Sequence, residues 1–237
     1  MIAAPMGLPG RIVVDGFLRM SQGQNALNDL NTKSGKITHA DGWGGVYSGV
    51  SGHQVHRSTA ACWADPRFDS LRDGTIYLLH ARRASTGGKR LENVHPFESI
   101  VDGSRWFFCH NGTVREHLPV PTTLANTDPT DSEKLFLQLL PFIREGRVLS
   151  GLREILGGIR DFTSLNSLLL GPDELWSVCL HSKHPDYYTL TLTSTPDGPV
   201  VSSEPLPELG GEQKSVSNGT ILRVGLGTGQ IENHTFD

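Results

Sequence analysis

The order of strand-like and helix-like segments is the feature that most restricts how this chain can fold. Short β-branched or aromatic runs come first, helical segments follow in the middle, and strand-like runs separated by turn signals fill the last third. Strands and helices do not alternate as they would in the βαβ units of a parallel sheet. This order predicts an α+β fold built on antiparallel sheets.

The first half of the chain is predicted to be mainly β-structure with one early helix. Residues 12–14 form a strand-like run after a turn at residues 8–10, and residues 17–30 carry apolar side chains at helical spacing. Further strands are expected at residues 42–47 and 53–56, joined by a turn, and at residues 75–79 and 106–109.

The clearest helix signal begins at Asp131. Apolar side chains recur three, four and seven residues apart from Leu135 onward, and Thr130 with Glu133 three residues later is typical of an N-cap. A second helix is expected around residues 149–155. Turn signals then separate predicted strands at residues 167–170, 175–180, 187–192, 199–202 and 220–224.

Composition excludes several classes of protein. The chain of 237 residues has no internal repeat or long linker, so we expect a single domain over residues 1–237. Its net charge of -4 does not favour binding to nucleic acid or an anionic membrane, and no apolar run approaches the ~20 residues of a membrane span. Three widely spaced cysteines and no signal peptide favour reduced thiols and a cytoplasmic location.

Polar residues gather in three segments at the ends of apolar strands. These segments are residues 39–44, residues 80–87 with 92–97, and residues 108–113 with 130–133. The pair Arg82-Arg83 offers planar groups suited to a carboxylate, and Asn111-Gly112 is either a tight turn or a pair of donors for an oxyanion. Taken singly, each of these features more often has a structural role.

Taken in order, the segments resemble class-II glutamine amidotransferases. The matching patterns are D-G-W-G, H-x-R-x-[AS]-[ST]-x-G, N-x-H-P-F, H-N-G and [ST]-D-[ST]-E, and they span residues 39–133. The resemblance is closest to the stand-alone branch that includes the γ-glutamyl hydrolase of ergothioneine biosynthesis and the amidotransferase-like hydrolases of glutathione breakdown. Residues 200–206 and 218–222 also look like that branch.

The resemblance implies the fold of the N-terminal-nucleophile hydrolases. This fold is a four-layer αββα sandwich, in which two antiparallel sheets pack together and helices lie outside. We expect the helices that begin near Phe17 and at Asp131 to cover one sheet.

The resemblance also implies how a γ-glutamyl group would be held. Arg82 matches the arginine that grips the α-carboxylate, with Ser85, Thr86 and Gly87 in the loop around it. Asp131 matches the carboxylate that pairs with the α-ammonium group. Opposite charges would thus clamp both ends of the zwitterion.

The oxyanion hole is implied at Asn111 and Gly112. The side-chain amide of Asn111 and the backbone N–H of Gly112 match the two donors that stabilise the negative oxygen of the intermediate. His95 and His110 match family histidines, for which we favour a structural role. Trp43 could belong to the core or to the pocket wall.

The chain departs from the family at the nucleophile. In the family, an N-terminal cysteine attacks the amide and its own α-amino group serves as the base. The sequence begins Met1-Ile2-Ala3, which fits the family start if a cysteine immediately precedes Met1. We expect Cys109 to be a buried core thiol, because a cysteine within the chain has no α-amino group to activate it.

Two functions therefore remain open. One is a glutamine amidotransferase-like hydrolase of a γ-glutamyl amide, active only with a cysteine ahead of Met1. The other is an inactive homologue that binds a γ-glutamyl ligand or regulates a partner enzyme. The expected ligand is a small γ-glutamyl molecule, with a separate synthetase subunit if the released ammonia is used.

A metallohydrolase is the alternative from another class of enzyme. Its candidate ligands would be His39, Asp41, His80, His95 and His110. No H-E-x-x-H or H-x-x-E-H pattern connects them, so neither a metal nor another cofactor is expected. We instead expect Arg82, Asn111, Gly112 and Asp131 to converge on one cleft near Met1.

Overall fold

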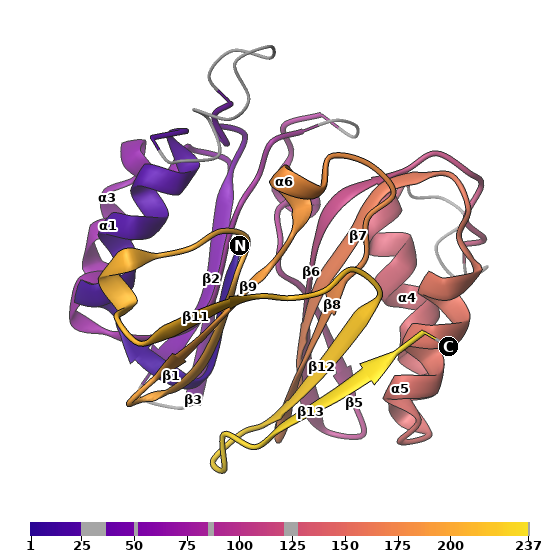
Figure 1. Cartoon of the computed structure of the whole chain (residues 1–237). Coiled ribbons are helices and arrows are strands. Elements are labelled where there is room, and N and C mark those ends of the chain that lie inside the picture. Colours follow the sequence, from indigo (N-terminus) through magenta and orange to yellow (C-terminus); the bar gives the residue numbers. More distant parts are fainter. Residues whose placement is uncertain (25–36, 50–51, 85–87, 121–127, 237) are drawn as a thin grey trace.

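The computed structural model describes residues 1–24, 37–49, 52–84, 88–120 and 128–236. Two sheets pack face to face, and helices lie on the outer face of each (Figure 1). The paired strands in both sheets are antiparallel. The predicted α+β fold, a four-layer αββα sandwich, is confirmed.

The first sheet has seven strands in the order β11-β9-β10-β1-β4-β2-β3. The strand β1 lies in its interior between β10 and β4, so the start of the chain is fixed on both sides. The seven strands are β1 (Ile2–Pro9), β2 (Trp43–Gly49), β3 (Gly52–Ser58), β4 (Thr75–Ala81), β9 (Thr191–Thr195), β10 (Gly198–Ser202) and β11 (Glu212–Ser215).

The second sheet has six strands in the order β13-β12-β8-β7-β6-β5. Its longest strand, β6, pairs with β5 on one side and β7 on the other. The six strands are β5 (Phe97–Val101), β6 (Ser104–Val114), β7 (Phe162–Leu170), β8 (Glu174–Cys179), β12 (Thr220–Gly225) and β13 (Ile231–Thr235).

The helices cover opposite outer faces of the sandwich. On the first sheet lie α1 (Gly10–Ser21) and α3 (Pro66–Asp69), and on the second lie α4 (Asp131–Arg144), α5 (Val148–Gly151) and a short π-helix at Leu152–Leu156 (Figure 1). The expectation that the helices near Phe17 and at Asp131 cover one sheet is wrong, because each packs on its own apolar cluster. A short helix, α6 (Pro185–Tyr188), lies on the crossing from β8 to β9.

The apolar core has three layers that match this architecture. Phe17 packs under α1 against the first sheet, and Leu135 packs under α4 against the second. Between the sheets lies a third cluster, which includes Leu78 from β4, Phe107 from β6 and Leu168 from β7. This middle layer fixes the two sheets face to face, so the strand ends above it meet at one edge.

The helix α1 corrects the prediction of a strand at residues 12–14. It begins at Gly10, where a Cβ would lie 1.7 Å from the carbonyl oxygen of Leu71, and its buried face includes Val13, Val14 and Phe17. Burial of this face against the first sheet outweighs the β-propensity of the branched side chains. The described helix ends at Ser21, and the rest of the predicted helix, from residue 25, lies outside the described residues.

The remaining predictions divide into confirmed strands and one further correction. The strands expected at residues 53–56, 75–79 and 106–109 lie within β3, β4 and β6, and the strand expected at residues 42–47 overlaps β2, which begins one residue later. The strand expected at residues 187–192 is wrong at its start, because α6 occupies Pro185–Tyr188 and β9 begins at Thr191. The described helices include none long and apolar enough to cross a membrane.

Candidate active site

A cavity of about 590 Å³ opens where strand ends from both sheets meet. Its walls come from the end of β4, the end of β6, the start of α4 and the helix α6. Arg82, Asn111, Gly112 and Asp131 all line this cavity, as expected. The loop residues Ser85, Thr86 and Gly87 lie outside the described residues.

A smaller cavity connects this site with the start of β1. Its volume is about 50 Å³, and it shares His39, His80, Asn111 and Tyr187 with the large cavity. Met1 lines it, and the Met1 amino nitrogen donates a hydrogen bond to Ser203 Oγ over 2.7 Å. Burial lowers the pKa of this amino group to about 6. The expected closeness of the cleft to Met1 is therefore confirmed.

Arg82 is a buried cation at the end of β4. The residue is only 5% exposed, and its Nη1 donates a hydrogen bond to the carbonyl oxygen of Gly88 over 2.8 Å. Burial lowers the pKa of the guanidinium, whereas the charges of Asp41 and Asp131 raise it. Backbone hydrogen bonds to Asp41 and Gly42 hold the strand end in place. The D-G-W-G segment thus positions Arg82.

Asn111 and Gly112 lie within β6, so the Asn-Gly pair is not a tight turn. Asn111 is opposite Asn166 and Gly112 is opposite Leu165 on β7, with a shift of register before Val114. Such an irregularity changes the direction in which a strand presents its groups. Within the described part of the chain, the Asn111 side chain has no hydrogen-bond partner, although it lines both cavities.

Asp131 is held by backbone donors at the start of α4. Its Oδ2 accepts a hydrogen bond from Val114 N over 2.8 Å, and its Oδ1 accepts one from Ser132 N over 2.9 Å. The predicted N-cap is confirmed, because Thr130 Oγ1 accepts a hydrogen bond from Glu133 N over 3.3 Å. A carboxylate at this position is stabilised by the positive end of the helix dipole. These contacts join α4 to β6 beside the cavity.

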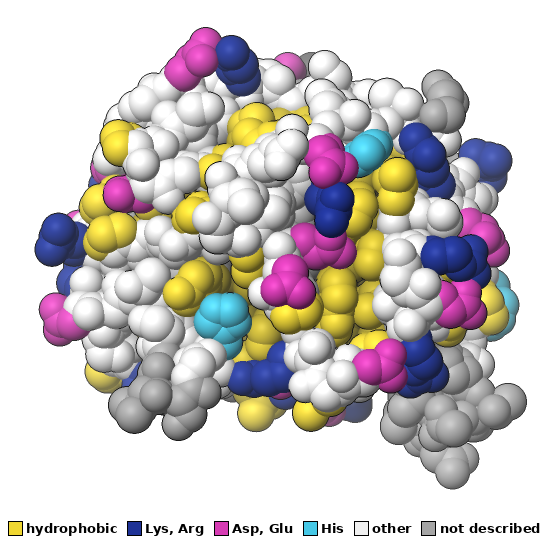
Figure 2. Space-filling view, turned by 90° about the horizontal axis from the view of Figure 1, so that it is seen from below, with side chains coloured by type: hydrophobic (Ala, Val, Ile, Leu, Met, Phe, Trp, Pro, Cys, Tyr) yellow, Lys and Arg dark blue, Asp and Glu magenta, His cyan; other side chains and the backbone are white. Residues whose placement is uncertain are grey.

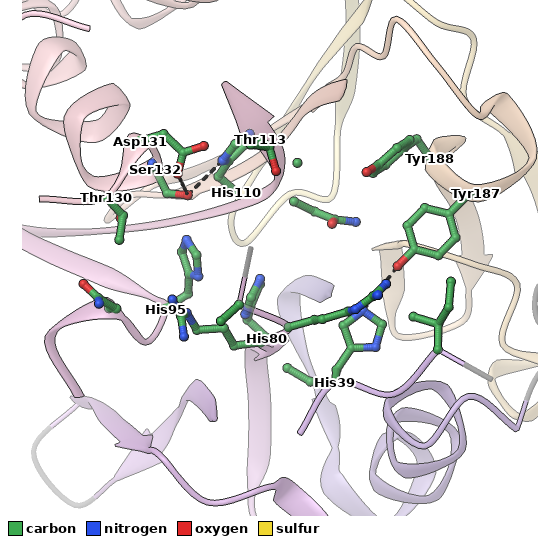
Figure 3. Close-up of a pocket in the computed structure, with 18 of the residues that line it drawn as sticks. His39, His80, His95, His110, Thr113, Thr130, Asp131, Ser132, Tyr187 and Tyr188 are labelled. Atoms are coloured by element: carbon green, nitrogen blue, oxygen red, sulfur yellow. Dashed lines mark hydrogen bonds between the residues drawn. The ribbon is translucent and has the colours of Figure 1, made fainter. Parts of the chain in front are cut away.

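His110 makes the contacts of a structural residue. Its Nε2 lies 3.0 Å from the carbonyl oxygen of Ser164, and its Nδ1 lies 2.9 Å from Ser132 Oγ (Figure 3). Since a carbonyl oxygen only accepts, Nε2 must carry the proton and Nδ1 must accept from the serine. Burial lowers the pKa of the ring, which favours this neutral tautomer.

His80 and His95 pack against each other on the cavity wall. Their ring centroids are 4.2 Å apart, and burial lowers the pKa of both rings well below the usual value. His80 Nδ1 and both ring nitrogens of His95 have no hydrogen-bond partner among the described residues. No group of three or more His, Cys, Asp or Glu side chains placed to hold a metal occurs in this described part.

Tyr187 and Tyr188 line the cavity from α6, and the sequence prediction missed both. Tyr187 Oη lies 3.4 Å from His39 Nε2, which links α6 to the loop before β2 (Figure 3). Burial lowers the pKa of His39 to about 4 and raises that of Tyr187 to about 12, so both groups are neutral near pH 7. The sequence signal that could have identified them is the pair of adjacent aromatic residues shortly after a His-Pro turn.

Trp43 belongs to the core and not to the pocket wall. Its side chain is fully buried, packs edge-on against Phe68, and donates from Nε1 to Asp65 Oδ2 over 3.1 Å. The neighbouring Gly44 is required because a Cβ there would lie 2.2 Å from the carbonyl oxygen of His95. The motif around Trp43 therefore supports the site through packing.

The three cysteines are buried away from the cavity lining. Cys109 lies in the cluster between the sheets, where burial raises the pKa of its thiol, so the predicted core role is confirmed. Cys179 donates to the carbonyl oxygen of Val216, and Cys62 packs beneath α1. Among the described residues, no thiol faces the site.

The family model for class-II glutamine amidotransferases matches residues 26–183. A Haemophilus influenzae protein named as a candidate glutamine amidotransferase is 26% identical over 160 residues, which cover 62% of this chain and 54% of that protein. The Escherichia coli protein YafJ, named in the same way, is 31% identical over 107 residues, covering 43% and 42% of the two chains. The chain thus spans about half the length of these curated relatives.

Solved structures support the fold. Glutamine phosphoribosylpyrophosphate amidotransferase from B. subtilis superposes with a TM-score of 0.65 at 17% identity, covering 96% of this chain and 47% of that chain. A predicted glutamine amidotransferase from Pseudomonas aeruginosa superposes with a TM-score of 0.58 at 21% identity, covering 84% and 90%. The superposition with the Pseudomonas aeruginosa protein therefore covers most of both chains.

Proposed function

Because this chain belongs to the class-II glutamine amidotransferases, we propose that its large cavity binds the γ-glutamyl group of an amide and supports its hydrolysis. The resemblance in sequence is closest to stand-alone members that act on γ-glutamyl conjugates. In this proposal the ligand is glutamine or a γ-glutamyl conjugate, and residues 1–237 act as one domain. Where the released ammonia is used, a separate synthetase subunit consumes it.

The observation that carries the proposal is the arrangement of charge around neutral donors. The buried cation Arg82 and the carboxylate of Asp131 line the same cavity as the side-chain amide of Asn111, which has no hydrogen-bond partner among the described residues. A γ-glutamyl group has an α-carboxylate and an α-ammonium at one end and a reacting carbonyl at the other. Opposite charges would fix its zwitterionic end, leaving the carbonyl toward the donors.

The nucleophile in this proposal is a cysteine joined to the amino nitrogen of Met1. A residue attached there would enter the small cavity, because that nitrogen lies beside Ser203 and the cavity is also lined by Asn111. Its thiolate would attack the γ-carbonyl carbon, and the oxygen would receive hydrogen bonds from Asn111 and Gly112. The C–N bond then breaks, the amine leaves with a proton, and water releases glutamate from the thioester.

The decisive experiment compares three forms of the protein. One is the chain as printed, the second has cysteine added before Met1, and the matched control has alanine at the same added position. We expect all three to bind glutamine or γ-glutamyl amides in calorimetry, and only the cysteine form to release glutamate. A cysteine form that binds but does not hydrolyse would instead support a binding role. Equal turnover by the alanine form would rule out the cysteine mechanism.

A further inference from the structure

Two of the charged groups around the large cavity are not used by the proposed function. Its described lining contains four Arg or Asp residues, which are Arg82, Arg83, Asp131 and Asp186. The γ-glutamyl group uses Arg82 and Asp131. Arg83 and Asp186 therefore remain for the part of the substrate on the other side of the amide bond.

Arg83 is an exposed cation beside the contact between His39 and Tyr187. Within the described residues, its guanidinium makes no hydrogen bond or ion pair, and Asp186 is not paired with it. Burial is the largest cause of the lowered pKa of His39, and the positive charge of Arg83 lowers it further. The same charge acts to lower the pKa of Tyr187, against the larger effect of burial. A free cation thus lies next to two neutral groups that form hydrogen bonds.

His39 and Tyr187 lie apart from the Asp131 end of the proposed zwitterion clamp. Figure 3 shows His39 and Tyr187 on one side of the cavity and Asp131 on the other. A cavity of about 590 Å³ lies in the range of ~300–1,000 Å³ typical of sites for larger ligands. It is roomier than glutamine alone requires, so a substantial leaving group can occupy the side near Tyr187.

We infer that Arg83, with His39 and Tyr187, forms a subsite for a carboxylate on the leaving group. The preferred ligand is then a γ-glutamyl amino acid or peptide with a free carboxylate, and glutamine is a poorer one. This inference rests on the proposed function, because it assumes that Arg82 and Asp131 hold the γ-glutamyl end. A guanidinium with adjacent hydroxyl and imidazole groups suits a carboxylate in charge and in hydrogen bonding.

Asp186 provides the competing possibility that the experiment must separate. It is exposed on the first turn of α6 and also lines the cavity, where it would favour a cationic leaving group. The two charges therefore predict opposite preferences. Three ligands of similar size distinguish them: γ-glutamylglycine, γ-glutamylglycinamide and the mono-γ-glutamyl amide of ethylenediamine.

The experiment measures the binding of these three ligands by calorimetry with the chain as printed, so hydrolysis does not intervene. We expect γ-glutamylglycine to bind about threefold to tenfold more tightly than the glycinamide, and the cationic ligand to bind most weakly. Arg83→Gln should remove this preference. Arg144→Gln is the matched control, because it removes the same charge at the far end of α4 and should preserve the preference.

Other outcomes separate this inference from the proposed function. Equal affinities for the three ligands, or a preference for the cation, would overturn the carboxylate subsite while leaving the γ-glutamyl site intact. Arg82→Gln should weaken the binding of all three ligands to the same extent. If none of the three binds to the unaltered chain, both the subsite and the proposed function are wrong.

Discussion

A Cβ atom on Gly112 would lie only 1.8 Å from the carbonyl oxygen of Ser164 on the neighbouring strand. The same carbonyl oxygen accepts a hydrogen bond from His110 Nε2, so it cannot move away without breaking that contact. Gly112 also has a φ angle of 156°, near the edge of the region that disfavours other residues. Position 112 therefore requires glycine, because two strands approach each other closely there, beside the candidate oxyanion hole.

The first prediction concerns this close approach. Gly112→Ala should lower the free energy of unfolding by about 3 kcal/mol or more, because the new methyl group collides with backbone. Gly158→Ala is the control, since a Cβ there has open space within 4 Å, and it should change stability by less than about 1 kcal/mol. Urea denaturation followed by circular dichroism measures both. Equal stability of the two variants would contradict the packing argument.

The second prediction concerns the side-chain amide of Asn111. In the form with cysteine before Met1, Asn111→Ala should lower kcat by about 10²–10³-fold, with a much smaller change in KM. The reason is that this donor is needed mainly when negative charge develops on the carbonyl oxygen. Asn233→Ala, on the exposed edge strand β13, should leave both constants unchanged. Steady-state glutamate release is the measurement, and a change in KM alone would reject the oxyanion role.

The third prediction concerns the charge of Asp131. Asp131→Asn keeps the shape of the side chain and should weaken γ-glutamyl binding about tenfold to a hundredfold by removing a charged partner of the α-ammonium group. Glutaramic acid lacks the α-amino group and provides the control ligand. It should bind the variant and the unaltered chain with similar affinity in calorimetry. A loss of equal size for both ligands would mean that Asp131 acts only through structure.

The fourth prediction concerns stability at mildly acidic pH. Burial lowers the pKa values of His39, His80, His95 and His110 in the folded protein, that of His39 from 6.5 to about 4. The unfolded chain therefore binds more protons than the folded chain below about pH 6.5, and stability must fall as pH falls through this range. The loss of stability that is due to His39 is complete near pH 4, where the folded protein also protonates this ring.

The measurement for this prediction is the urea midpoint between pH 7 and pH 5. Most carboxylates remain ionised in that window, so the buried histidines and the buried amino group of Met1 determine the slope. His39→Gln should reduce the slope, whereas substitution of the exposed His117 by Gln should not. A midpoint that is constant over this range would show that the buried histidines gain protons as easily as exposed ones.

Sequence patterns predicted the elements whose signals are local. The helix at Asp131 carries its own N-cap and apolar spacing, and β2, β4 and β6 are apolar runs with a polar motif at one end. The motif order also indicated which residues share a cavity, because Arg82 follows β4, Asn111 lies near the end of β6 and Asp131 begins α4 at the same edge of the sandwich. Local signals were sufficient in these places because backbone conformation there agrees with side-chain preference.

The sequence alone determined the α+β class, and it predicted the residues proposed to form the γ-glutamyl clamp. Only the tertiary structure decided that residues 12–14 are helical, that Trp43 is core, and that Tyr187 meets His39 across 148 positions. Each of these outcomes depends on a surface contributed by a distant segment, such as the first sheet beneath α1. A residue's own neighbours in sequence do not encode that surface, because burial against it is a property of the assembled layers.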